Sequence, residues 1–244
     1  MKPVRTILLR ELSGYFATPI AYVVLAFFLL SANGLAFGLG GLFERGQADM
    51  APFFTFLPWV FMVLGPAVTM RLWAEERRNG TVELLLTQPI TLWHAVLGKF
   101  LAAWLFVGIA LALTFPLWIT LNYLGNPDNG AIFAGYVGAF LMAAVYLALG
   151  SLTSALTKNQ LIALLLGVWA SFMLLLTGYP MVTDWFRTWA PQWVTDGIVS
   201  LSVLTHFESI TKGVLDLRDV LYFALFTTFF LLASAVVLDA RKSK

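Results

Sequence analysis

The sequence contains no cysteine and only two histidines in 244 residues. Without cysteine, neither a disulfide nor a thiolate metal site can form. Charged residues make up only 11% of the chain and hydrophobic residues 60%, and the mean hydropathy is +0.84. Because soluble domains are about half apolar, this composition predicts an integral membrane protein with little room for a soluble domain.

Catalytic motifs are also missing. The nearest approach to a P-loop, Gly98-Lys99-Phe100, lacks both the first glycine and the hydroxyl residue. His94 and His206 are predicted on opposite sides of the membrane, each as an interfacial residue, so they cannot share a metal ion. The net charge of +2 argues neither for nor against a nucleic-acid partner, because such proteins usually carry a concentrated basic face; we expect none. We therefore expect no enzyme activity and no cofactor or metal bound directly by this chain.

Long intervals without charge predict an all-α protein with six transmembrane helices. A bilayer core of about 30 Å requires about 20 apolar residues per span. Lys99 lies near the start of the third span, where a long side chain can snorkel to the interface. We expect the polar residues left inside the bundle to join helices rather than to bind substrate; they are Asn33, Asn122, Ser151, Thr153 and Ser154. The predicted spans are residues 19–42, 52–71, 96–123, 132–156, 160–180 and 220–238.

The distribution of lysine and arginine sets the orientation. With both termini in the cytoplasm, 11 of the 15 basic residues lie inside and only Arg45, Arg187, Lys212 and Arg218 lie outside. This asymmetry follows the positive-inside rule. The outside instead carries most of the acidic residues, namely Glu44, Asp49, Asp128, Asp184, Asp196, Glu208, Asp216 and Asp219. The sequence thus predicts a multi-pass protein of the bacterial inner membrane with cytoplasmic N- and C-termini.

Two further segments are predicted outside the spans. Residues 1–16 place apolar side chains at helical spacing opposite Lys2, Arg5 and Arg10, which is typical of an amphipathic helix in the cytoplasmic interface. The external segment, residues 181–218, carries tryptophans spaced by four, but Pro191 interrupts any single helix. We expect short interfacial or re-entrant helices there.

The most informative stretch is the cytoplasmic loop, residues 73–93. It gathers five charges into nine residues, from Glu75 to Glu83. Asn79-Gly80 is a turn signal, Thr81 can cap a helix and Pro89 can end one. The apolar residues between them favour insertion into a groove of a partner protein over a simple charged stop.

This loop, EERRNGTVELLLTQPIT (75–91), resembles the signature loop of ABC-2 type transporter permeases. The external HFESITKGVLDLRDVLYF (206–223) is similar to the branch with gliding-motility and nitrous-oxide-reductase-maturation permeases. The resemblance implies a coupling helix that seats in a separate cytoplasmic ABC ATPase, which binds ATP and Mg, and re-entrant helices over about 185–217. It also implies a dimer with a second copy or a paralogue. The implied coupling residues are Glu75, Glu76, Arg77, Arg78, Gly80, Thr81, Val82, Glu83, Leu84, Leu85, Leu86 and Pro89.

The expected function is therefore that of the membrane permease subunit of an ABC transporter, an exporter driven by a partner ATPase. One alternative is a mechanotransmitting ABC complex that acts on a periplasmic or membrane accessory protein. Another is a membrane anchor or assembly factor that uses no energy. An ion-coupled carrier is disfavoured, because the spans are almost bare of ionisable groups. The sequence leaves the substrate open.

Overall fold

The chain is almost entirely helical in the computed structural model, which describes residues 2–80, 91–188 and 190–240. Over those residues it contains no strand, so the predicted all-α fold is confirmed. The helices are α1 (Lys2–Phe16), α2 (Pro19–Gly38), α3 (Ala51–Thr69), α4 (Arg71–Asn79), α6 (Leu92–Ala112), α7 (Phe115–Leu124), α8 (Asn129–Leu156), α9 (Gln160–Leu176), α10 (Pro180–Arg187), α11 (Gln192–Ser200), α12 (Val203–Thr211) and α13 (Leu217–Ala240).

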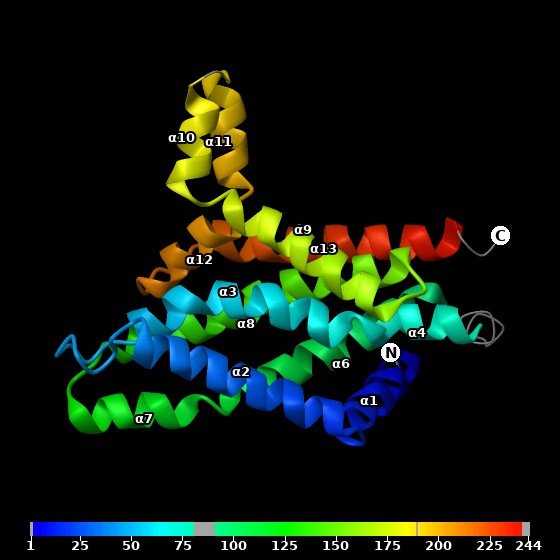
Figure 1. The fold of residues 1–244 in the computed structure, drawn as a ribbon, viewed down its shortest axis with the longest axis horizontal. Helices are drawn as coiled ribbons and strands as arrows, with labels where there is room; N and C mark the ends of the chain where they lie inside the picture. The colour runs from blue at the N-terminus through cyan, green and yellow to red at the C-terminus, as the bar shows by residue number, and fades with distance from the viewer. Residues whose placement is uncertain (1, 81–90, 189, 241–244) are drawn as a thin grey trace.

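Among the described residues, five helical stretches are long and apolar enough to cross a membrane. They are α2, α3 with α4, α6 with α7, α8 and α13. A sixth span results if α9 and α10, which meet at an angle of 67°, count as one broken span. Successive crossings alternate in direction, and α1, α4 and the end of α13 lie at the same end of the bundle (Figure 1). This arrangement agrees with termini on one side, which is the cytoplasmic side by the charge asymmetry.

Helix α8 is the centre of the bundle and packs against α3, α6, α9, α12 and α13. Small residues let its neighbours approach closely, as is usual for membrane helices. At Gly65 of α3, for example, an added Cβ would lie 2.8 Å from the Tyr146 Cβ of α8 and 3.1 Å from its backbone. The core of the molecule therefore forms around α8.

The third predicted span differs from the structure in its bounds and its continuity. The helix begins at Leu92 rather than at residue 96, with Thr91 as its N-cap. It breaks after Ala112, and α7 begins with Pro116 in its first turn. Proline lacks the N–H group that an uninterrupted helix requires, so it can begin a helix more easily than continue one.

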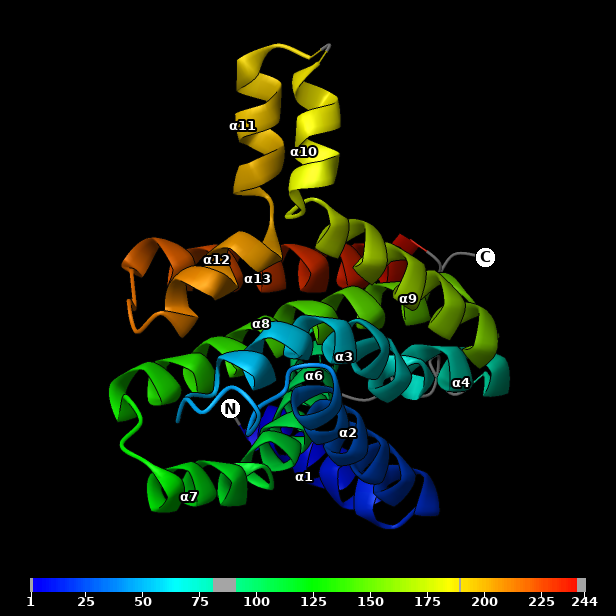
Figure 2. The ribbon, with the colours of Figure 1, turned by 60° about the vertical axis from the view of Figure 1, so that its left-hand side comes forward.

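The external segment folds into three short helices, α10, α11 and α12. α10 ends before Pro191 and α11 begins directly after it, as the sequence predicted. They pack against each other, and Figures 1 and 2 both show the pair standing out from the bundle. In contrast, α12 packs against α8 and α13.

Candidate functional site

The predicted coupling region begins on a helix and not in an irregular loop. Residues 71–79 form α4, which continues the direction of α3 after a break at Met70 (Figure 1). Gly80 ends α4 in the left-handed conformation, with φ of 70°. Glycine adopts that conformation without steric cost, which explains the turn signal at this position. The charged cluster is thus the solvent-side extension of the second span, and the predicted loop of residues 73–93 is corrected at its start.

Ser154 of α8 forms hydrogen bonds with backbone groups at the start of α4. Its Oγ accepts hydrogen bonds from the N–H groups of Trp73 and Ala74, both at 3.1 Å, and donates one to the carbonyl of Met70 at 2.9 Å. The Trp73 indole N–H donates to the Ser151 Oγ at 3.0 Å. The first N–H groups of a helix lack partners within the helix, so a serine of another span caps α4. The predicted helix-joining role of Ser151 and Ser154 is confirmed.

Lys99 of α6 joins α4 to the N-terminal helix. Its Nζ lies 2.9 Å from the Glu76 Oε1 and 3.2 Å from the Glu11 Oε1, and 5.4 Å from the centre of the Trp73 ring. The Lys99 side chain is only 4% exposed. The expectation that it snorkels to the interface is therefore wrong, because two carboxylates supply the counter-charge that water would otherwise provide.

Two further residues of the cluster bind the neighbouring spans. Arg77 donates a hydrogen bond of 2.6 Å to the carbonyl of Ala155, at the end of α8. Glu75 forms an ion pair of 2.9 Å with Arg71 and accepts a hydrogen bond of 3.3 Å from Gln160 at the start of α9. The cluster thus ties α4 to α1, α6, α8 and α9, which supports the prediction that these charges hold the base of the coupling segment.

Arg78 is the member of the cluster that faces outward. It is exposed, and its side chain has no hydrogen bond or ion pair among the described residues. Arg78 is therefore accessible to a partner. The predicted coupling residues Thr81, Val82, Glu83, Leu84, Leu85, Leu86 and Pro89 lie outside the described residues, so the coupling helix itself stays a prediction.

A charged cavity of about 430 Å³ lies between α1 and α4. Its lining includes three basic residues, Arg10, Arg71 and Lys99, and three acidic residues, Glu11, Glu75 and Glu76, so the formal charges balance. The Tyr15 hydroxyl beside it donates to the carbonyl of Val68 at 3.1 Å. Burial, and then the charge of Glu11, raise the pKa of Tyr15, whereas Arg71 lowers it less. Tyr15 therefore remains a hydrogen-bond donor at physiological pH.

At the opposite end of the molecule, His206 forms a contact that the sequence did not predict. Its Nδ1 lies 2.6 Å from the Asp219 Oδ1, its Nε2 lies 3.2 Å from the Ser200 carbonyl, and both side chains are buried. The His206 ring stacks on Tyr222 at 4.0 Å between centroids. Both ring nitrogens thus face oxygen atoms of neighbouring groups. His206 is thus a joint between α12 and α13 and not an exposed interfacial residue.

Neither end of the described structure presents a catalytic constellation. Over residues 2–80, 91–188 and 190–240, no group of three His, Cys, Asp or Glu side chains is placed to hold a metal ion. The cytoplasmic end instead contains a network of contacts that holds α4 in place. Helix α4 is fixed by charge-assisted hydrogen bonds to α6, α8 and α9, and through Lys99 to α1.

Comparison with known proteins identifies the family of this chain. The model of the ABC-2 family transporter protein matches residues 17–240. Heme exporter protein B of Paracoccus denitrificans (strain Pd 1222) is 36% identical over 107 residues, 43% of this chain and 47% of the relative. The probable multidrug ABC transporter permease YbhS of Escherichia coli (strain K12) is 26% identical over 180 residues, 73% of this chain and 46% of the relative.

The chain spans about half the length of the curated relatives that it matches. Their names differ from the predicted gliding-motility and nitrous-oxide-reductase-maturation branch, so the comparisons support the family and not that branch. The family match covers nearly the whole chain, including α4 and the spans to which it is tied. This chain belongs to the ABC-2 family of transporter permeases.

Proposed function

We propose that this chain is the membrane subunit of an ABC exporter and couples ATP hydrolysis by a separate cytoplasmic ATPase to movement of a substrate across the bacterial inner membrane. It acts as a dimer with a second copy or a paralogue. The ATPase binds ATP and Mg, and this chain performs no covalent chemistry. Family membership supports the pairing with an ATPase.

One observation carries the coupling mechanism: α4 is tied to the bundle on every side. Lys99 bridges it to α1 and α6, Arg77 reaches α8, and Glu75 reaches α9. A push on the segment that follows Gly80 cannot be absorbed by rotation of α4 alone, because these contacts oppose it. The push is instead passed to α3 and to four other helices together.

The names of the relatives suggest two classes of cargo, heme and drugs. Both are amphipathic molecules small enough for a path between helices. We therefore propose a small amphipathic substrate rather than a polysaccharide or a folded protein.

A mechanotransmitting role is the second candidate, and the α10–α11 pair favours it. This pair stands out from the bundle (Figure 2) and leaves Met181, Trp185 and Trp193 exposed. Aromatic residues on a projecting helical pair suit contact with an external partner protein. In this variant the outer helices would move a partner rather than release a substrate.

Cross-linking tests the ATPase contact directly. Because the chain contains no cysteine, Leu85→Cys creates a single reactive site in the proposed coupling segment. Val214→Cys, exposed on the outer side, is the matched control. With the complete complex in membranes and a reagent that joins a thiol-reactive maleimide to a photoreactive benzophenone, which inserts into C–H bonds of any neighbouring chain, we expect the Leu85→Cys variant alone to capture the ATPase subunit.

Failure of Leu85→Cys to capture the ATPase in complexes that co-purify would place the contact elsewhere on the cytoplasmic face. Absence of any co-purifying ATPase would instead favour the membrane anchor that uses no energy.

A further inference from the structure

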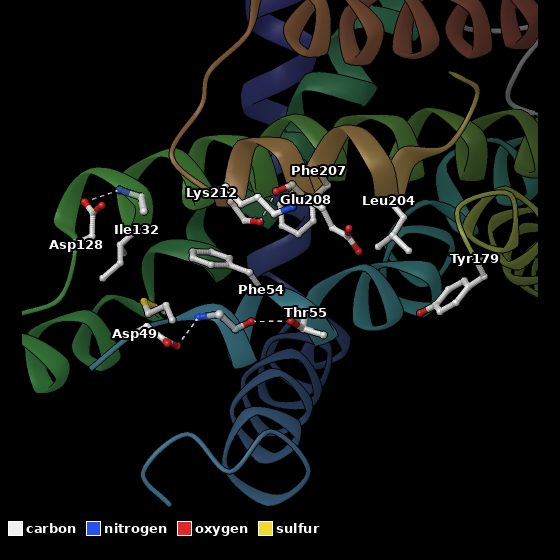
Figure 3. Close-up of a pocket in the computed structure, with 14 residues that line it drawn as sticks. Asp49, Phe54, Thr55, Asp128, Ile132, Tyr179, Leu204, Phe207, Glu208 and Lys212 are labelled. Carbon is white, nitrogen blue, oxygen red and sulfur yellow. Dashed lines mark hydrogen bonds between the residues drawn. The ribbon is translucent and has the colours of Figure 1, made fainter. Parts of the chain in front are cut away.

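The outer end of the bundle contains a cavity of about 490 Å³. Three helices form it: the starts of α3 and α8, and one face of α12 (Figure 3). Tyr179, between α9 and α10, closes one side. A volume of about 300–1,000 Å³ is typical of sites for small organic ligands.

The inner wall of the cavity is apolar and partly aromatic. Phe54 of α3 and Phe207 of α12 both line it, and their rings meet edge to face with centroids 6.3 Å apart. Ile132 and Leu204 continue the apolar surface. In Figure 3 Ile132 and Phe54 lie between the two aspartates and Glu208, and Leu204 lies beyond Glu208 toward Tyr179. The four apolar side chains are almost fully buried, so they form the floor of the cavity and expose only narrow strips to it.

The rim of the cavity is negative. Asp49, Asp128 and Glu208 line it, and Lys212 is the only basic residue among the lining residues. Asp49 and Asp128 each use the Oδ1 atom to accept backbone N–H groups at the start of α3 and α8. Each capping carboxylate therefore keeps its second oxygen, and its charge, for the cavity.

Glu208 adds a third negative charge to the rim. Its side chain is exposed and forms no hydrogen bond or ion pair within the described residues. Lys212 likewise forms none within that part of the chain, so the two do not neutralise each other in a direct pair. A cleft with walls of low dielectric and charge of one sign concentrates ligands of the opposite sign.

We propose that this cavity binds an amphipathic organic cation of drug size. The apolar group would lie over the apolar floor beside Ala51 and Tyr179, and the cationic group would face Glu208, Asp49 and Asp128. Multiply anionic ligands would be repelled. The cavity would hold the substrate at the outer end of its path. This role rests on the proposed export function, whereas binding of the cation does not depend on it.

One wall of the cavity is α12, and this helix is fixed to the last span by a buried contact. α12 supplies Phe207 and Glu208 on the cavity face, and the His206–Asp219 contact of 2.6 Å fixes the same helix to α13. A wall held by this buried contact keeps the site open between ligands, because binding then requires no ordering of α12.

Equilibrium binding of two xanthene dyes tests this proposal. Rhodamine 6G is cationic and fluorescein is dianionic, while their ring systems are alike. Fluorescence anisotropy is measured with the full chain in nanodiscs of zwitterionic lipid and with empty nanodiscs as the blank. We expect binding of rhodamine 6G above the blank and none of fluorescein.

Three variants localise the site. Glu208→Gln should weaken binding about threefold, the effect of one exposed charge pair. Thr55→Trp, at an exposed position of the lining, should reduce binding to the blank by filling the cavity. Asp196→Asn removes an exposed acidic residue of α11 outside the cavity and should change nothing.

Equal affinity in all three variants, or no binding above the blank, would overturn the proposal. Binding of a lysine-rich peptide without binding of the dye would also overturn it and assign the cavity to a partner protein. The assay contains no ATPase, so its failure leaves the proposed coupling function standing. Conversely, failure of the Leu85→Cys cross-link leaves the binding result intact.

Discussion

Replacing Lys99 by methionine tests how α4 is held. The side chain is 4% exposed and lies between two carboxylates, at 2.9 Å from Glu76 and 3.2 Å from Glu11. At an effective dielectric constant of about 20 each attraction is about 5 kcal/mol, most of it offset by loss of hydration. Lys99→Met fits the same volume but removes the positive charge that bridges Glu11 and Glu76, and among the described residues Glu11 then keeps only its exposed partner Arg10, at 3.1 Å.

Breaking a buried ion pair costs about 3–5 kcal/mol. Glu11 and Glu76 keep 21% and 19% exposure, so water compensates in part and the lower value, about 3 kcal/mol, applies. For a chain of this size we expect the midpoint of thermal unfolding to fall by about 6–12 °C in Lys99→Met. Lys158→Met, an exposed lysine at the same end, should change the free energy of unfolding by less than about 0.5 kcal/mol.

Adding Glu11→Gln and Glu76→Gln to Lys99→Met should recover much of the lost stability, because the two negative charges that Lys99 bridged are then removed together with it. Tryptophan fluorescence during heating in detergent micelles measures all three proteins. The reasoning is refuted if Lys99→Met unfolds at the wild-type temperature, or if the triple variant is no more stable than the single one.

Three further predictions concern the joints of the bundle. Gly65→Ala forces a Cβ into α8 and should cost about 1–3 kcal/mol of unfolding free energy, whereas Gly34→Ala, with open space, should stabilise α2 slightly in the same thermal assay. Ser154→Ala leaves the start of α4 uncapped and should cost about 2 kcal/mol by the same measurement, more than Ser151→Ala, which removes one indole contact. Because the folded pKa of Tyr15 is raised above its ordinary value of 10, its contribution is present below pH 10 and is lost as the pH rises further; unfolding of Tyr15→Phe should lack that alkaline dependence.

The sequence predicted what depends on local chemistry. Runs of apolar residues marked the spans, and Asn79-Gly80 marked the end of a helix, because the left-handed conformation at Gly80 favours glycine. Pro191 marked the break between α10 and α11 for a similarly local reason. The family resemblance of the loop rested on residues in one continuous stretch, and the family match confirms it.

What could not be predicted depends on residues far apart in the chain. Glu11 and Lys99 are separated by 88 positions, and no local pattern indicates that α1 crosses the bundle beside α4. His206 and Asp219 are only 13 positions apart, but their contact depends on the turn between α12 and α13. The position of Asp219 in the first turn of the last span, where a buried carboxylate requires a partner, was the one available signal.

The central claim is that force from the ATPase enters through the segment after Gly80 and passes through α4 to the outer end. Cysteines at Phe43 and Val214, both exposed at the outer end, allow a spin-label distance within one chain to be measured in the complete complex, with and without trapped ATP. We predict a distance change on ATP trapping that is lost in Glu76→Lys, although the ATPase still binds and hydrolyses ATP. The same ATP-dependent change in Glu76→Lys would contradict the account.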